Sequence, residues 1–216
     1  MNDDYTHITY VIDSSTSMGP VWPATISGLE EFIASQKKEA GKCTLSLINF
    51  DTQVQTPLNF ADIKFVNESV ADYNIHPKGC TALYDAVGRA INDTGRHLAT
   101  LPESARPAKV VIVVQTDGEE NSSREFKGAQ IGAMIEEQRS KYNWQFMFVG
   151  ASEASIKAAT DVMKFDVGST TKYSTSNTKG YHDTMNSKLS SMRSARSLAD
   201  VSAAATYSDA ERSAML

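Results

Sequence analysis

The chain has 216 residues, of which 41% are hydrophobic and 22% are charged, and its formal net charge is -5. This balance is typical of one globular domain, and the acidic excess argues against a general nucleic-acid binder. The first five residues form neither a basic nor an apolar region, and no stretch has the apolar length that a membrane span needs. We therefore expect no secretion signal and no membrane partner. Cys43 and Cys80 match no zinc pattern and are expected to be free thiols.

The first half of the chain predicts alternating strands and helices. The run Ile8–Ile12 is short, β-branched and aromatic, which is typical of a buried strand. Pro23 and the apolar spacing after it predict a helix that ends near Gly41. The runs 44–50 and 54–60 predict a hairpin, and Pro57 indicates that the second of these strands lies at the sheet edge.

The second half continues this alternation. A helix is predicted from Leu83, and the unbroken run Val110–Val114 is typical of a central parallel strand. Ser122 and Glu125 have the spacing of a capping box and predict the start of the next helix. A fifth strand over 144–149, a weak sixth over 164–167 and a last helix over 181–192 complete the prediction.

This order predicts a three-layer, doubly wound α/β fold with a six-stranded, mostly parallel sheet and one antiparallel edge strand. We expect one domain over residues 1–196. For the Ser- and Ala-rich tail, 197–216, the composition leaves disorder and a helical extension both open. Ligands of such sheets bind at the carboxyl ends of the strands, where the strand order reverses. Asp13 and Asp117 end the two strongest central strands, so that edge is the expected site.

Oxygen-bearing side chains follow several predicted strands at this edge. Asp13, Ser15 and Ser17 alternate after the first strand, Thr81 precedes a helix, and Asp117 ends the run that is most apolar. Two carboxylates and three hydroxyls suit a hard cation, with Mg²⁺ first and Mn²⁺ or Ca²⁺ as alternatives, and they leave a coordination position open. Taken alone, the serines are explained equally well as caps of the following helix.

The five residues, in this order, resemble the metal-ion-dependent adhesion site of the von Willebrand factor A domain. Its motif is Asp-x-Ser-x-Ser, a distant Thr and a more distant Asp. Thr16 stands where the family commonly has Gly, at a position that supplies no ligand. The resemblance implies the strand order 3-2-1-4-5-6 and a partner protein whose Asp or Glu completes the metal shell. The metal ligands that it implies are Asp13, Ser15, Ser17, Thr81 and Asp117.

A narrower resemblance runs from Thr6 to Arg196, and segments 79–88, 116–121 and 141–151 carry it. It is to small, stand-alone cytoplasmic A-domain proteins of bacteria and phages, and more loosely to members of tellurite-resistance and stress gene clusters. It implies a cytoplasmic location, in a bacterial cell or a phage-infected host, and it assigns no partner, pathway or oligomeric state. Residues 119–121 flank the predicted site, either as partner-selecting or supporting side chains or as a solvated acidic loop.

Two other functions are compatible with an open metal position. One is a metal-dependent hydrolase of the phosphatase or nuclease type. A phosphatase with an Asp nucleophile would usually carry a second carboxylate where this chain has Ser15, and neither a Walker-type loop nor a Gly-x-Ser-x-Gly elbow is present. The other is a scaffold that the metal only stabilises. We therefore expect a metal-dependent protein-binding module that is not an enzyme.

Overall fold

The computed structural model describes residues 1–216 except for the side chain of residue 71. Its six-stranded sheet has the order β3-β2-β1-β4-β5-β6. Only the β2–β3 pair is antiparallel among these strands, so the predicted order and the antiparallel edge strand are confirmed. The strands are β1 (Asn2–Asp13), β2 (Lys42–Phe50), β3 (Val54–Asp62), β4 (Pro107–Thr116), β5 (Gln145–Gly150) and β6 (Thr170–Lys172).

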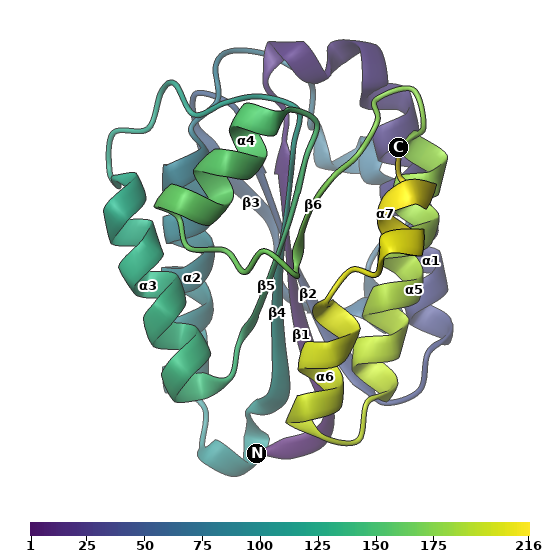
Figure 1. The fold of residues 1–216 in the computed structure, drawn as a ribbon. Coiled ribbons are helices and arrows are strands. Elements are labelled where there is room, and N and C mark those ends of the chain that lie inside the picture. Colours follow the sequence, from purple (N-terminus) through teal and green to yellow (C-terminus); the bar gives the residue numbers. More distant parts are fainter.

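Helices cover both faces of the sheet, which confirms the three-layer α/β fold (Figure 1). Helices α1, α5 and α6 pack on one face, and α2 and α3 pack on the other. The helices are α1 (Trp22–Lys38), α2 (Leu83–Ala99), α3 (Gly128–Tyr142), α4 (Glu153–Lys157), α5 (Thr178–Ser194), α6 (Leu198–Ala205) and α7 (Asp209–Ala214). Short helical turns are η1 (Thr16–Val21), η2 (Ile63–Phe65), η3 (Val70–Tyr73), η4 (Glu103–Ala105) and η5 (Ala158–Val162).

The central strands are apolar on both sides because each side has its own core. On β4, Val111 and Val113 belong to the core beneath α1 and α5, whereas Ile112 and Val114 belong to the core beneath α2 and α3. All four are fully buried. Full burial of such a side chain stabilises the fold by about 1.5–3 kcal/mol, so this strand is held firmly and its end is a rigid support.

The predicted sixth strand over 164–167 is wrong, because β6 begins at Thr170. Lys164 has a left-handed backbone with φ +59°, which interrupts an extended strand. Asp166 then forms a turn, in which its carboxylate accepts a hydrogen bond from Gly168 N at 2.8 Å. The sixth strand therefore begins six residues later than the apolar pattern predicts.

The predicted capping box at Ser122 and Glu125 is also wrong, because α3 begins at Gly128. The buried Asp85 carboxylate accepts hydrogen bonds from the backbone N–H groups of residues 124, 125 and 126 at 2.8–2.9 Å. This long-range contact holds the stretch as a loop. Glu125 instead forms an ion pair with Arg89.

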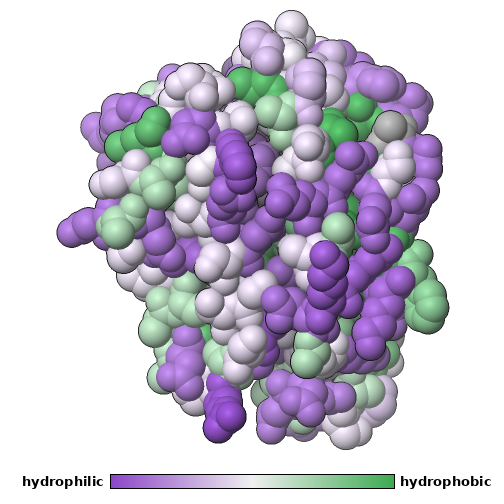
Figure 2. All heavy atoms as spheres, turned by 90° about the vertical axis from the view of Figure 1, so that its right-hand side faces the viewer, coloured by the Kyte–Doolittle hydropathy of each residue, from purple (hydrophilic) through white to green (hydrophobic). Residues whose placement is uncertain are grey.

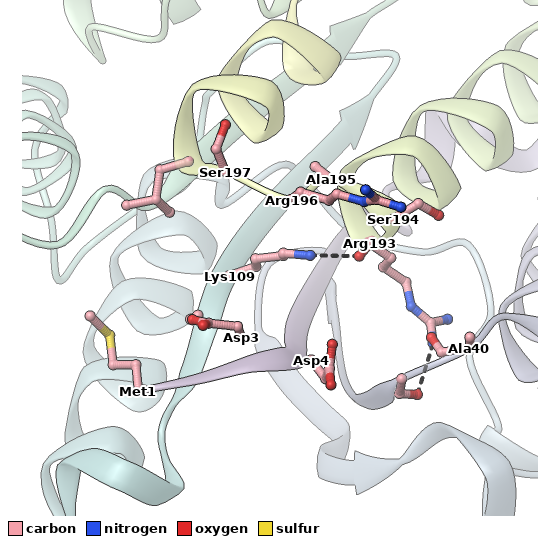
Figure 3. Close-up of a pocket in the computed structure, with 13 residues that line it drawn as sticks. Met1, Asp3, Asp4, Ala40, Lys109, Arg193, Ser194, Ala195, Arg196 and Ser197 are labelled. Carbon is pink, nitrogen blue, oxygen red and sulfur yellow. Dashed lines mark hydrogen bonds between the residues drawn. The ribbon is translucent and has the colours of Figure 1, made fainter.

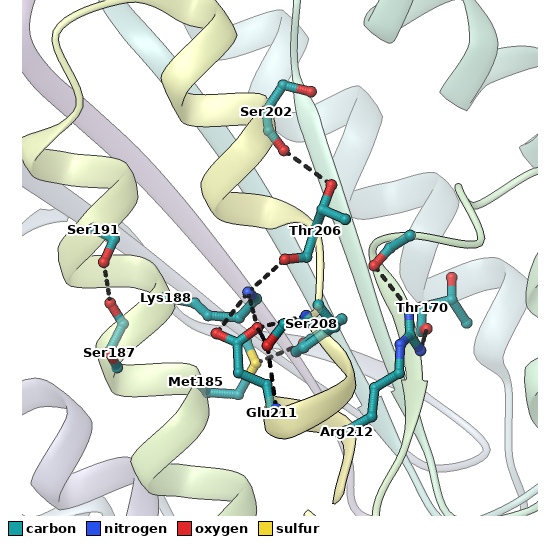
Figure 4. A network of polar contacts seen from close by, with 12 residues as sticks. Thr170, Met185, Ser187, Lys188, Ser191, Ser202, Thr206, Ser208, Glu211 and Arg212 are labelled. Carbon is teal, nitrogen blue, oxygen red and sulfur yellow. Dashed lines mark hydrogen bonds and ion pairs between the residues drawn. The ribbon is translucent and has the colours of Figure 1, made fainter. Parts of the chain in front are cut away.

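Residues 197–216, which the sequence left open between disorder and helix, contain α6 and α7. Lys188 of α5 donates hydrogen bonds to Thr206 O at 2.8 Å and to Glu211 at 3.0 Å (Figure 4). Arg212 donates to Thr170 O on β6 at 2.6 Å. Tyr207 and Met215 are buried in the core shared with α1 and α5. The C-terminal residues therefore complete this core, and hydrophilic side chains predominate on the outer surface of this side (Figure 2).

Among the described residues, no helix has both the length and the apolar character needed to cross a bilayer.

Candidate metal centre

Three loops meet at the carboxyl edge of the parallel strands, which is the upper edge in Figure 1. Asp13 is the last residue of β1, and Asp117 directly follows β4. Thr81 lies two residues before α2. Since β1 and β4 are adjacent and parallel, their ends bring the two aspartates to the same part of the edge.

Asp13 is fully buried and both of its oxygens accept hydrogen bonds. Oδ1 accepts from the backbone N–H of Ser15 at 2.7 Å, and Oδ2 accepts from Thr116 Oγ1 at 2.5 Å. These contacts fix the carboxylate at the end of β1. Such fixed orientation is what a ligand of a small cation requires.

The two serine hydroxyls connect this loop to Asp117. Ser15 Oγ lies 3.0 Å from Ser17 Oγ, and Ser17 Oγ donates to Asp117 Oδ1 at 2.7 Å. Ser15 is buried, whereas Ser17 is exposed and Asp117 is half-buried. The open side of the group therefore lies toward Ser17 and Asp117.

Gly118 shows where the oxygen atoms converge. A Cβ atom built on this glycine would lie 3.2 Å from Thr81 Oγ1 and 3.7 Å from both Asp13 Oδ2 and Ser17 Oγ. Three oxygens, two from the loop after β1 and one from the loop before α2, thus surround one small space that the missing side chain of Gly118 leaves open. Ser15 and Asp117 are joined to this group through their contacts with Ser17.

Burial sets the electrostatics of the carboxylates. It raises the pKa of Asp13 from 3.8 to about 6, against the lowering effect of the hydrogen bonds from Thr116 and Ser15, and the nearby Asp117 charge raises it further. Burial also raises the pKa of Asp117, which the hydrogen bond from Ser17 opposes. Two negative groups held in a partly dry edge favour the binding of a cation, because the cation compensates both charges.

The donor set fits a hard divalent cation. It consists of two carboxylates and three hydroxyls, with no Cys or His among the five side chains, and oxygen ligands suit hard ions. Asp13, Ser15, Ser17, Thr81 and Asp117 could supply oxygens to an octahedral ion such as Mg²⁺. An ion of this kind commonly keeps water molecules as well, so a position for an outside oxygen remains.

Sequence reasoning missed several residues that position these side chains. Thr116 holds Asp13 and accepts a hydrogen bond from Gly118 N at 3.1 Å. Thr16 Oγ1, where the family commonly has Gly, donates to Gly79 O at 3.0 Å and so ties the first loop to the loop of Thr81. Gly79 has φ +66°, and a side chain there would meet Thr52. The sequence does carry a signal for both threonines, because Thr116 directly precedes Asp117 and Thr16 lies between Ser15 and Ser17.

The loop after Asp117 is fastened to the start of α2. Asn121 Oδ1 accepts from Thr81 N at 2.9 Å, and Asn121 N donates back to Thr81 O at 3.0 Å. Glu120 accepts from Tyr84 N at 2.9 Å and from Ser123 N at 2.7 Å. Glu120 and Asn121 therefore support the position of Thr81, whereas Glu119 is exposed.

A hollow of about 520 Å³ lies at the opposite edge of the sheet (Figure 3). Its buried cations are engaged in the fold, because Lys109 donates to Arg193 O at 2.6 Å and Arg193 donates to Gln36 O at 2.6 Å. The second of these contacts satisfies a carbonyl at the C-terminal end of α1. The oxygen-rich carboxyl edge is accordingly the better candidate for a functional site.

Comparison with solved structures finds the same fold in several proteins at low sequence identity. A mussel byssus proximal thread matrix protein, solved with a zinc-occupied MIDAS motif, has a TM-score of 0.61 at 14% identity over 88% of this chain and 47% of its own. A von Willebrand factor type A protein from Catenulispora acidiphila has a TM-score of 0.57 at 16% identity, over 88% and 43%. The vWF domain of the pilus tip protein Mfa5 from Porphyromonas gingivalis has a TM-score of 0.61 at 11% identity, over 85% and 94%.

This chain spans about half the length of the mussel and Catenulispora proteins. No curated protein matches it in sequence. The family profile of the von Willebrand factor type A domain, however, matches residues 7–197, which include all three loops of the candidate metal centre. The chain therefore belongs to the von Willebrand factor type A domain family.

Proposed function

We propose that this protein is a metal-dependent protein-binding module, in which Mg²⁺ at the candidate metal centre binds an Asp or Glu side chain of a partner protein. The proposed ligands are Asp13, Ser15, Ser17, Thr81 and Asp117, some of them through water. The observation that carries this proposal is the convergence of oxygens from the loop after β1 and from the loop before α2 on the space beside Gly118, which follows β4.

The exposure pattern supports an outside ligand rather than a closed structural ion. Asp13, Ser15 and Thr81 are at most 3% exposed, whereas Ser17 on the outer side is exposed. A cation bound by these buried side chains would keep the coordination positions on its solvent side for water or for a carboxylate. A partner carboxylate suits such an ion because it is a hard, negatively charged oxygen ligand.

The metal is proposed to be Mg²⁺, with Mn²⁺ and Ca²⁺ as alternatives. The zinc of the mussel protein shows that a MIDAS motif can hold another divalent ion in that relative. In this chain, the donor set consists of oxygens alone, which favours hard ions over zinc.

We further propose that the protein binds its partner inside the cell and without catalysing a reaction. The resemblance to stand-alone cytoplasmic members of the family supports the location, and the free thiols of Cys43 and Cys80 suit a reducing compartment. In this proposal, the site binds a partner because the ion has an open position that accepts the partner's carboxylate.

The test compares Ser17→Ala with Ser191→Ala in a binding experiment. Ser17 is exposed at the metal centre, whereas Ser191 is an exposed serine of α5 whose hydroxyl bonds only Ser187 O, at 2.9 Å. Each protein is immobilised and exposed to proteins of a bacterial lysate in Mg²⁺ and in EDTA, and Mg²⁺ affinity is measured by calorimetry.

We expect wild type and Ser191→Ala to bind Mg²⁺ and to retain the same proteins, but only when Mg²⁺ is present. An excess of free acetate should release these proteins. Ser17→Ala should lose about tenfold in Mg²⁺ affinity and retain less. Absence of Mg²⁺ binding by wild type, or retention that neither EDTA nor acetate reduces, contradicts the proposal.

A further inference from the structure

The turn between β2 and β3, residues 51–53, contacts the loop that carries Thr81. Strand β2 is adjacent and parallel to β1, so this turn lies at the same carboxyl edge of the sheet as Asp13. Thr81 Oγ1 is one of the three oxygens that surround the space beside Gly118. The turn is therefore placed where it can affect one side of the candidate metal centre.

The β2–β3 turn holds the backbone on both sides of Thr81. Cys80 N donates a hydrogen bond to Thr52 Oγ1 at 2.9 Å, and Ala82 N donates to Asp51 O at 2.9 Å. The N–H of Thr81 itself donates at 2.9 Å to the loop that follows β4. Three consecutive N–H groups thus bind two different loops, and together these contacts set the position of Thr81.

The turn can fix another segment because it is itself well ordered by internal hydrogen bonds. Asp51 N donates to Gln53 O at 3.0 Å, and Gln53 N donates back to the Asp51 carboxylate at 2.8 Å. Asp51 is only 4% exposed, so the start of the turn is anchored in the fold. Thr52 is presented between these two residues.

The glycine at position 79 allows Thr52 to approach the Thr81 loop closely. A Cβ atom built on Gly79 would lie 2.6 Å from Thr52 Oγ1, and Gly79 has φ +66°, a conformation that favours glycine. Thr16 holds the same glycine from the other side, because its N–H and its hydroxyl both donate to Gly79 O. The contact with Thr52 is therefore built into the shape of this loop.

The hydrogen bond from Cys80 to Thr52 fixes geometry more than it stabilises the fold. Thr52 and Cys80 are both exposed, so water can satisfy the Cys80 N–H when the hydroxyl is absent. Water cannot, however, hold the loop at a fixed distance from the turn. Mg²⁺ requires nearly ideal octahedral positions of its ligands, so a small displacement of Thr81 weakens its binding.

We propose that Thr52 is a positioning residue of the candidate metal centre, which acts through the Cys80 N–H to hold the Thr81 hydroxyl in place for the cation. This inference rests on the proposed function, because it assigns Thr52 a role toward the ion. The turn after β2 then supports Thr81 from one side, and the loop after β4 supports it from the other.

The experiment measures Mg²⁺ binding by calorimetry and the metal-free Tm in EDTA for Thr52→Val, Thr52→Ser and Ser46→Ala. Valine has the shape of threonine but cannot accept the hydrogen bond, whereas serine keeps the hydroxyl. Ser46 is the matched control, because it lies on β2 of the same hairpin and its hydroxyl accepts from Phe60 N at 3.0 Å. Ser46→Ala thus removes the same kind of contact from the strands rather than from the turn.

We expect Thr52→Val to weaken Mg²⁺ binding about tenfold, as loss of a residue that supports a metal ligand typically does, with little change in the metal-free Tm. Thr52→Ser should restore the affinity of wild type. Ser46→Ala should lower the Tm and bind Mg²⁺ as wild type does. A Kd for Thr52→Val within twofold of wild type, or a Kd for Thr52→Ser as weak as that of Thr52→Val, overturns the inference and leaves the proposed function standing. Absence of Mg²⁺ binding in wild type overturns both.

Discussion

Substitution of Asp13 by Asn should stabilise the metal-free protein and abolish its stabilisation by Mg²⁺. Asp13 is fully buried, and burial is the main reason that its pKa is about 6 rather than 3.8. A side-chain amide of the same shape can keep the hydrogen bond from Ser15 N and can donate to Thr116 Oγ1. The substitution therefore removes the buried charge and preserves the contacts.

The magnitude follows from the pKa of Asp13. Each pH unit corresponds to about 1.4 kcal/mol, so the change from 3.8 to about 6 costs the ionised, metal-free protein about 3 kcal/mol at pH 7. Because the folded state binds the proton more tightly, the contribution of Asp13 to stability falls as pH rises from about 4 to 6. At 216 residues, 3 kcal/mol corresponds to a Tm difference of roughly 6 °C or more.

The assay is thermal unfolding of wild type and Asp13→Asn in EDTA at pH 7 and pH 4.5, and in Mg²⁺ at pH 7. We expect the variant to melt higher in EDTA at pH 7 and its advantage to shrink at pH 4.5, where wild-type Asp13 is protonated. Mg²⁺ should raise the Tm of wild type alone. A variant that melts lower than wild type in EDTA at pH 7, or an advantage that is equal at both pH values, refutes the reasoning.

Three further predictions follow from the same structure. The Mg²⁺ affinity of wild type, measured by calorimetry, should be nearly constant above pH 7 and should fall by up to tenfold per pH unit below about pH 6, because the ion must displace the proton of Asp13. A constant affinity down to pH 5 contradicts this prediction. Gly118→Ala should weaken Mg²⁺ binding at least tenfold with little change in the metal-free Tm, because its Cβ would lie 3.2 Å from Thr81 Oγ1; unchanged calorimetric affinity contradicts it. Glu211→Gln should lower the free energy of unfolding in urea by about 1–3 kcal/mol and speed hydrogen exchange in residues 197–216, because the almost fully buried Lys188 ammonium loses its counter-charge. Equal exchange in the variant and wild type contradicts this prediction.

The sequence by itself determined five of the six strands, because their patterns depend on local rules. Apolar β-branched runs, helical spacing and Pro57 predict which segments are strands or helices and which strand is at the edge. The family resemblance supplied the strand order, which the structure confirms. The carboxyl ends of parallel strands share one edge, so the approximate meeting of Asp13 with Asp117 could also be predicted.

Contacts between distant segments decided the rest. Asp85 delays the start of α3 by binding three N–H groups far along the chain, and a left-handed Lys164 delays β6. Neither effect has a signal within a local window of sequence. The last residues pack on α5 because Lys188 finds Glu211 there, and composition alone cannot report a partner that lies 23 residues away.

The candidate metal centre shows the same division most clearly. Residue types and spacing predict which oxygens could meet a cation. Only the tertiary structure shows the space beside Gly118 where they converge and the burial that raises the pKa of Asp13. Each of these depends on distances between atoms of different elements, and such distances exist only once the core has packed.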